Sequence, residues 1–146
     1  MTGSAADDTL DRNLEKREAV AVYSIGKLNK DLYRCVTRDI ATDEVILTDE
    51  RIAHIQQRHP GDYERFAQYL FEIISDPDYI LQANKPNTAF LLKQICDADE
   101  RFELILRLKV CSDPAGYKNS VITFLRIEEK KWKKYIRNKT VLYKKE

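Results

Sequence analysis

The chain has 146 residues, of which 43% are hydrophobic and 34% charged, and its formal net charge is +1. This length is that of one domain of the commonest size, roughly 100–150 residues, and the hydrophobic fraction excludes an intrinsically disordered chain. Four glycines and four prolines in the whole chain exclude a fibrous or low-complexity protein. No apolar run approaches the ~18–20 residues of a membrane helix, so we expect no membrane partner.

The cysteines point to neither a metal nor a disulfide framework. Cys35, Cys96 and Cys111 are odd in number and irregularly spaced. There is no C-x-x-C pair, and two histidines do not complete a zinc-finger pattern. We therefore expect reduced cysteines at strand ends, with no metal site and no cofactor.

Positive charge is concentrated near the C-terminus. Between Ala115 and Glu146, ten Lys/Arg residues accompany three Asp/Glu, which leaves 15 basic and 21 acidic residues in the first 114. Such an asymmetry is typical of a domain that binds a polyanion at one end, although a solvated helix face gives the same pattern.

The first part of the chain predicts one polar segment and two strands. Residues 1–18 are polar, with a short helix expected from Asp8 or Thr9, and a single domain follows over residues 19–146. The β-branched run Ala19–Ile25 favours a strand, and Leu32–Val36 favours a second, weaker one.

Two helices are expected next. Thr48 can cap a helix that carries acids in its first turn and ends near His59, because Pro60 disfavours helical geometry in the residue before it. A second helix is expected from Asp62 to about Ile74, with apolar residues at the helical period.

The remainder of the chain alternates like successive strands separated by turn clusters. Short loops between them predict an antiparallel meander. The strands are expected over residues 79–81, 88–95, 102–110 and 120–125, followed by a basic helix over 128–136 and a short strand over 141–143. The fold class is therefore α+β, with N-terminal helices packed on a roughly four-stranded antiparallel sheet and a basic C-terminal helix.

The chain's two histidines lie on the first of these helices. At about 100° per residue, Ile52, Ile55 and His59 share one side of it, and His54 and Arg58 share another. Histidine can act as an acid or a base near neutral pH, and a nearby arginine can bind phosphate. His59 also has a purely structural explanation, since a histidine at a helix C-terminus interacts favourably with the helix dipole.

A polar cluster interrupts the last long strand. In a regular strand over 117–123, Ser120 would share a face with Ile122, and Asn119, Val121 and Thr123 would point to the opposite face. These polar groups can orient a phosphate or a histidine, or simply bond to the local backbone. Thr88, Lys93 and Arg107 add polar groups on neighbouring strands.

Several stretches together resemble a known family. They are LTDERIAHIQQRHPGDYE, ISDPDYIL, PNTAFLLKQI, LRLKV and GYKNSVITFLRIEEKKWKKYIRNKTVLYKK. Over residues 44–145 the chain resembles the phage-associated branch of the barnase–EndoU–colicin–RelE-like nucleases, which occur at the C-termini of phage head-morphogenesis proteins and in polymorphic toxins. The resemblance implies N-terminal helices, a four-stranded antiparallel sheet and metal-independent ribonuclease activity.

We therefore expect an endoribonuclease, acting on RNA such as tRNA, in which the ribose 2′-OH attacks the adjacent phosphorus. His54 and His59 are the candidate acid and base, without assignment of which is which. The candidate groups that stabilise or orient the phosphate are Arg58, Lys93, Arg107, Tyr117, Ser120 and Thr123. The candidate RNA-binding cations are Lys118, Lys130, Lys131, Lys133, Lys134, Arg137 and Lys139.

The competing hypothesis is a non-catalytic module on the same fold, since fold alone does not prove function. Such a module would bind nucleic acid or a phage head protein through the basic helix, and its histidines would be structural. A toxin would add an immunity protein as partner and would act in the cytoplasm or be carried on a phage particle.

Overall fold

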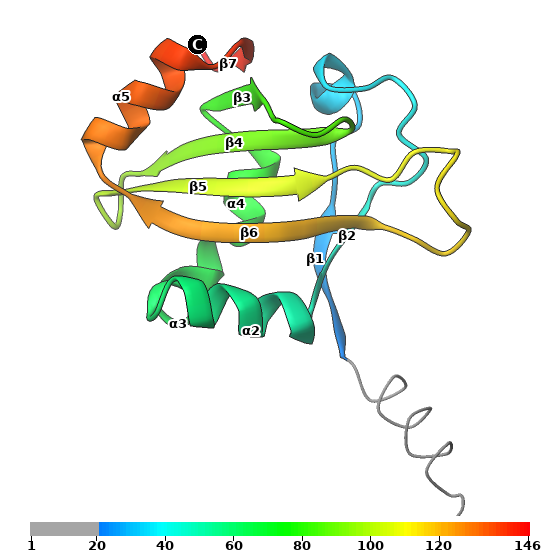
Figure 1. Ribbon diagram of the computed structural model, residues 1–146, viewed down its shortest axis with the longest axis horizontal. Helices are drawn as coiled ribbons and strands as arrows, with labels where there is room; N and C mark the ends of the chain where they lie inside the picture. Colours follow the sequence, from blue (N-terminus) through cyan, green and yellow to red (C-terminus); the bar gives the residue numbers. More distant parts are fainter. Residues whose placement is uncertain (1–20) are drawn as a thin grey trace, which may run out of the picture.

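The computed structural model describes residues 21–146 (Figure 1). The strands are β1 (Val22–Lys27), β2 (Glu44–Thr48), β3 (Tyr79–Gln82), β4 (Thr88–Ile95), β5 (Glu100–Arg107), β6 (Asn119–Ile127) and β7 (Val141–Lys144). The helices are η1 (Leu32–Cys35, 3-10), α2 (Asp49–Arg58), α3 (Asp62–Phe66), η2 (Ala67–Tyr69, 3-10), α4 (Leu70–Ser75) and α5 (Glu129–Asn138). The polar segment 1–18 and the helix expected from Asp8 lie outside the described residues.

The α+β class is confirmed, but the four-stranded antiparallel sheet is wrong. The sheet has seven strands in the order β1-β2-β6-β5-β4-β3-β7, and β2 pairs with β6 in parallel. The expected meander is its centre, β3 to β6, where every neighbouring pair is antiparallel. The parallel pairing joins segments about 75 residues apart (Val45↔Asn119), and strand propensity says nothing of such distant partners. The helices α2 to α4 also follow two strands rather than preceding the sheet.

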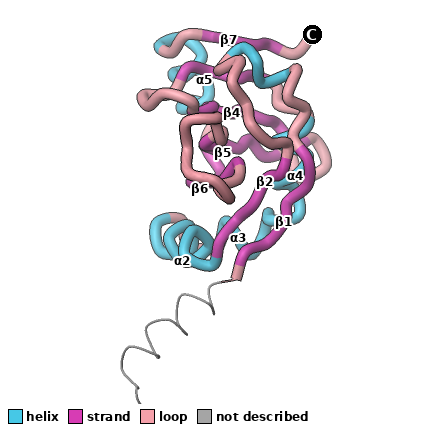
Figure 2. The backbone as a smooth tube through the Cα atoms, turned by 90° about the vertical axis from the view of Figure 1, so that its right-hand side faces the viewer, coloured by secondary structure: helices cyan, strands magenta, loops and turns pink. Residues whose placement is uncertain are grey.

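The sheet is covered on both faces. On the first face, Leu91 of β4 and Leu104 of β5 belong to a large apolar core that includes buried residues of α2 and α4. On the second face, Phe90 and Leu125 pack with Trp132 and Ile136 of α5. Figure 1 shows α2 and α3 beside β6, on the side away from β5, and Figure 2 shows α4 on one side of the central strands. We call the second face the α5 face.

The helix predicted from Asp62 to Ile74 is interrupted. Its apolar positions are correct, since Phe66, Leu70 and Ile73 are all buried. The backbone of Phe66 departs from helical geometry (φ −127°, ψ 6°), and its ring packs edge-on against Phe102 with 4.9 Å between centroids. Tertiary packing of one aromatic side chain therefore coincides with the break between α3 and η2.

The strand predicted over Leu32–Val36 is wrong, because these residues begin the 3-10 helix η1. The Asn29 carboxamide accepts hydrogen bonds from the backbone N–H groups of Asp31 and Leu32, which starts the turn locally. Tyr33 is fully buried, and its hydroxyl donates to the carbonyl of Ile74 at 2.6 Å. A side chain at the helical turn thus anchors the loop to α4.

Three local expectations can be compared directly with the structure. The Thr48 hydroxyl accepts from the N–H of Arg51 at 3.2 Å, so the cap of α2 is confirmed. Cys35, Cys96 and Cys111 are all free and exposed, although Cys35 lies in η1 rather than at a strand end. No helix within residues 21–146 is long and apolar enough to cross a membrane.

A buried asparagine closes the parallel junction between β2 and β6. Asn119 is 0% exposed. Its carboxamide donates to the carbonyls of Thr42 (2.8 Å) and Glu44 (2.9 Å) and accepts from the N–H of Lys109 (2.7 Å). Since only Val45↔Asn119 and Ile46↔Ser120 pair across this junction, this one side chain supplies much of its bonding.

Asn119→Ala is expected to lower the free energy of unfolding by roughly 2–5 kcal/mol, because it leaves buried backbone groups without partners. Urea denaturation of both proteins measures the change. Asn138→Ala, at the exposed end of α5, is the matched control and should stay within about 0.5 kcal/mol of the wild type. Equal stability of Asn119→Ala and wild type would contradict the role of this amide.

Candidate functional site

A groove crosses the α5 face between α2 and the end of α5. Its floor is Phe90 of β4, Ile105 of β5 and Ile122 of β6. Arg51 of α2 lies on one side and Lys139, just after α5, on the other. The cavity volume is about 420 Å³, within the roughly 300–1,000 Å³ range of small-molecule sites. We call this cavity the sheet groove.

A second cavity of about 350 Å³ adjoins the sheet groove at Arg107. We call it the loop pocket. Its lining comes from the end of β5, the loop between β5 and β6 and the start of β6: Arg107, Lys109, Asp113, Tyr117, Lys118 and Ser120, with Ile46 and Gly116. Of the residues proposed from the sequence, Arg107, Tyr117, Lys118 and Ser120 therefore lie together.

Arg107 is held in place at the boundary between the two cavities. Its Nη1 and Nη2 contact the Asp113 carboxylate at 3.2 and 3.0 Å, and Nη1 also donates to the carbonyl of Leu108. A hydrogen bond from the N–H of Val110, followed by the Arg107 guanidinium, holds the pKa of Asp113 below its ordinary value. Asp113 thus stays ionised and fixes the guanidinium beside both cavities.

Positive charge dominates the lining of both cavities. Asp113 is the one acid among the residues that line them. The cations are Arg51, Lys85, Arg107 and Lys139 around the sheet groove, and Lys109 and Lys118 in the loop pocket. Lys118 forms an ion pair with Glu44 at 3.0 Å. This surplus is suited to a polyanion.

The bulge in β6 changes which polar side chains share a face. Strict alternation would put Ser120 and Thr123 on opposite faces, and this expectation is wrong. The register shifts so that Ser120 pairs with Arg107 and Thr123 pairs with Ile105. Residues directly opposite each other on neighbouring strands point to the same face. Ser120 and Thr123 are therefore both on the α5 face.

The histidines lie on α2, beside the sheet groove rather than in its lining. The predicted apolar positions of this helix are confirmed, since Ile55 is buried and Ile52 packs against the core, while His54 is half-buried. His59 is the residue after α2 and has non-helical backbone geometry, so the helical period does not place it on the same side. Arg51, His54 and Arg58 fall within about 60° around the helix axis. His54 and Arg58 therefore share the flank whose first residue, Arg51, lines the groove.

His59 ends α2 and has a shifted pKa. Its backbone N–H bonds to the carbonyl of Ile55 at 2.8 Å. Burial lowers the pKa of His59; Asp62 opposes this shift, and the positive charges of Lys131, Arg58 and His54 add to it. These charged groups, which include Lys131 in the first turn of α5, are therefore close enough to His59 to change its pKa.

The basic helix α5 is fixed to the sheet by its apolar side. Trp132 packs edge-on against Tyr79 with 5.9 Å between ring centroids, and Tyr135 packs in the same way against Phe90 at 4.8 Å. Lys139 places its Nζ 4.7 Å from the centre of the Phe90 ring. The other predicted RNA-binding residues of α5 are exposed: Lys130, Lys131, Lys133, Lys134 and Arg137.

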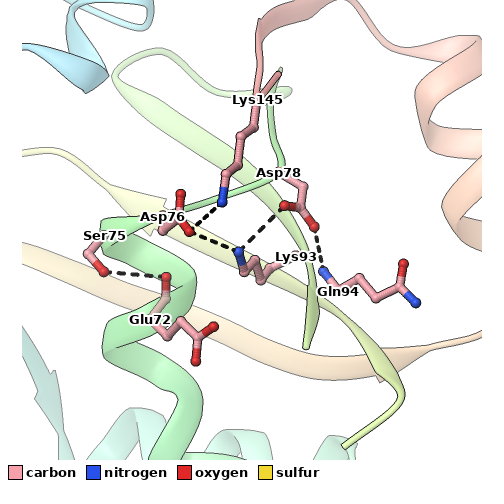
Figure 3. A network of polar contacts seen from close by, with 7 residues as sticks. All are labelled: Glu72, Ser75, Asp76, Asp78, Lys93, Gln94 and Lys145. Atoms are coloured by element: carbon pink, nitrogen blue, oxygen red, sulfur yellow. Dashed lines mark hydrogen bonds and ion pairs between the residues drawn. The ribbon is translucent and has the colours of Figure 1, made fainter. Parts of the chain in front are cut away.

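Lys93 does not join the other proposed site residues. It lies on the face opposite α5, between Leu91 and Ile95, which both belong to the larger core. Its side chain is 6% exposed, and Nζ contacts Asp76 at 3.2 Å and Asp78 at 3.5 Å (Figure 3). Lys145 also contacts Asp76, at 2.6 Å, and this bond, with that from Lys93, lowers the pKa of Asp76. The network ties the end of β7 to β4.

Sequence reasoning missed Glu103, a buried acid on the α5 face. It is 8% exposed, and its Oε1 has no hydrogen-bond partner among the described residues. Burial raises the pKa of Glu103, while the Tyr135 hydroxyl and the charges of Lys131 and Lys139 oppose the shift. The alternation of β5 predicts that Glu103 faces away from the side of the sheet that carries Phe102 and Leu104. Only the position of α5 shows that this other face is covered, so that Glu103 is buried.

A comparison with known protein families shows which family the chain belongs to. Residues 22–144 match the family described as phage-Barnase-EndoU-ColicinE5/D-RelE like nuclease2. The chain belongs to this family. The resemblance inferred from the sequence is thereby confirmed, and nuclease activity is the function that the family implies. Neither the curated proteins nor the solved structures provide a match.

The raised pKa of Glu103 predicts a pH dependence of stability. A carboxyl whose pKa is higher in the folded than in the unfolded protein stabilises the fold below its unfolded pKa of about 4.3, and this contribution is lost as the pH rises through the folded value. Glu103→Gln cannot titrate. Relative to wild type, this variant should therefore become more stable between pH 4 and pH 8.

Urea denaturation at a series of pH values tests this expectation. Glu146→Gln, at the exposed C-terminus, is the control and should follow the wild-type profile. A Glu103→Gln profile parallel to that of the wild type would show that Glu103 does not titrate abnormally.

Proposed function

We propose that the protein is a metal-independent endoribonuclease that cleaves RNA in the sheet groove and the loop pocket. The observation that carries the proposal is the cationic groove across the α5 face of a chain that belongs to a nuclease family. Phosphate binding by Lys and Arg supplies most of the sequence-independent affinity for nucleic acids.

The proposed reaction is an attack of the ribose 2′-OH on the adjacent phosphorus. The O–P bond to the 5′-oxygen of the next nucleotide breaks, a base accepts the 2′ proton, and an acid protonates the leaving oxygen. Arg107 and Arg58 are proposed to stabilise the charge on the phosphorane. Tyr117, Ser120 and Thr123 are proposed to orient the phosphate. Lys93 is left out, because it binds two carboxylates on the opposite face.

His54 and His59 remain the proposed acid and base. His54 shares a helix flank with Arg51, which supports a place beside the bound strand. The lowered pKa of His59 favours its neutral form at pH 7, which is the form that a general base requires.

A binding module without catalysis is the second candidate function. One observation favours it: neither histidine is among the side chains that line the two cavities. In such a module the groove would bind RNA without cleaving it, and the two histidines would have only a structural role at α2.

Cleavage assays with total tRNA separate these two functions. We expect the purified protein to cut tRNA equally well with and without excess EDTA, and His54→Ala to lower the rate at saturating RNA by about 10²-fold or more, as for loss of a general acid or base. Gln57→Ala, on the exposed side of α2, is the matched control and should cleave normally.

Two results would contradict the proposed reaction. Activity that disappears with EDTA and returns with magnesium would exclude a metal-independent mechanism. Equal cleavage of an oligonucleotide with deoxyribose at the scissile position would exclude the 2′-OH as nucleophile. An uncut tRNA that nevertheless binds would favour the binding module.

The cations of α5 are expected to act in two ways. Lys133→Ala combined with Lys134→Ala removes charges from the outer side of the helix. The salt dependence of log affinity for single-stranded RNA should become shallower by about 0.7 per lost contact. The saturating rate should stay unchanged, because such binding is equally strong in the ground and transition states. Lys139 lines the sheet groove itself, so Lys139→Ala should lower both the affinity for RNA and the rate of cleavage at saturating RNA.

Affinity measured from 50 to 300 mM salt and single-turnover cleavage together test this division. A loss of the saturating rate in the outer double variant, at an unchanged salt slope, would instead place those lysines in the reaction.

A further inference from the structure

The sheet groove has Phe90, Ile105 and Ile122 on its floor, whereas the adjoining loop pocket is lined by Arg107, Lys109 and Lys118, and this difference points to the form of the substrate. On the basis of the proposed function, we propose that the sheet groove binds one unpaired nucleobase of an RNA strand while the loop pocket binds a neighbouring phosphate. The substrate is then single-stranded RNA or a loop, and the groove confers a base preference.

The bulge in β6 adds a third apolar side chain to the floor of the sheet groove. Ile105 pairs with Thr123 and Leu106 with Val121, so Ile122 has no partner on β5. Bulges commonly redirect a side chain, and here Ile122 reaches the groove beside Ile105 and Phe90. Three apolar side chains on a sheet surface form a floor suited to the flat face of a heteroaromatic ring.

The rim of the sheet groove carries groups suited to the edge of a base. Asn84 and Thr88 line it from the connection between β3 and β4. A carboxamide both donates and accepts hydrogen bonds, as does the Watson–Crick edge of a nucleobase. The Thr88 hydroxyl donates to the carbonyl of Pro86 at 2.9 Å, which fixes its oxygen as an acceptor. Asn84, on an exposed loop, is therefore the residue that we assign to base selection.

The cations lie where the flanking phosphates of such a nucleotide would be. Arg107 lines both cavities, so a base in the groove and a phosphate in the loop pocket would be neighbours along the strand. Lys109 and Lys118 extend the positive charge through the loop pocket, and Arg51 and Lys139 flank the groove. A neutral aromatic ligand without phosphates would leave this charge uncompensated.

Duplex RNA does not fit this arrangement. In an A-form helix the Watson–Crick edges are paired and the bases stacked, so neither the face nor the edge of a base can reach the groove. An unpaired base can be splayed out, bound by its face and read at its edge.

Binding to uncleavable RNA tests the base site separately from catalysis. The probes are 2′-O-methyl oligonucleotides of one length, made of A, C or U, together with a 2′-O-methyl duplex of the same phosphate number. We expect the single strands to differ in affinity and at least one to bind about tenfold or more tightly than the duplex, since base contacts add to phosphate contacts.

Two neighbouring loop residues provide matched variants. Asn84→Ala should change the ratio of affinities among the three homopolymers by roughly three- to tenfold, as for one lost hydrogen bond, without changing the salt slope. Lys85→Ala should weaken all three equally and make the slope shallower by about 0.7. Both positions are exposed, and thermal denaturation verifies that each variant folds.

The base site is overturned if Asn84→Ala leaves the homopolymer ratios unchanged, or if duplex and single strands bind equally. Normal tRNA cleavage together with unchanged homopolymer ratios would contradict the base site but agree with the proposed nuclease activity. Changed homopolymer ratios in a protein that cleaves no RNA would support the base site and contradict the proposed nuclease activity.

Discussion

The buried carboxamide of Asn119 is the interaction on which the arrangement of the site depends. Its three hydrogen bonds join β6 to Lys109, just after β5, and to Thr42 and Glu44 at the start of β2. Buried polar groups are expensive to leave without partners, so this side chain specifies one alignment of the parallel pair. Because β2 runs directly into α2 at Thr48, the same alignment also decides where α2 lies relative to the sheet.

The groove is a consequence of how the two faces of the sheet are covered. On one face the apolar side chains of α2, α4 and η1 complete the larger core. On the α5 face, α5 covers one end of β3 and β4 through the contacts of Trp132 with Tyr79 and of Tyr135 with Phe90. The other end stays open between Lys139 and Arg51. There Ile105 and Ile122 stay partly exposed beside the buried ring of Phe90, because neither helix reaches across them.

Ion pairing distinguishes the buried Lys93 from the cations that line the two cavities. Lys93 is almost fully buried between two carboxylates, and such an ion pair cannot lose one partner without a large desolvation penalty. Around the sheet groove, Arg51, Lys85 and Lys139 line a cavity that holds no acid among its lining residues. Arg107 is intermediate, since Asp113 orients it and leaves it at the boundary of both cavities. The same residue types therefore stabilise the fold on one face and favour a polyanion on the other.

Local sequence signals determined the elements with local causes. The meander from β3 to β6, the Thr48 cap and the apolar positions of α2 all follow from periodicity and turn chemistry within a few residues. The family resemblance, too, rested on short motifs and is confirmed over residues 22–144. Such motifs also single out the histidines and the polar residues around Ser120 as candidates, but they do not define the spatial relation between them.

Tertiary structure alone decided what depends on distant contacts. The parallel pairing of β2 with β6, the break at Phe66 and the turn at Tyr33 each depend on a partner about 35 residues or more away. The bulge at Ile122 brought Ser120 and Thr123 to one face, and alternation alone cannot detect one unpaired residue. Glu103 and Lys93 differ from ordinary strand charges only through the helix or carboxylates that cover them. Burial is a property of the assembled chain, so it could not be inferred from either residue's neighbours in sequence.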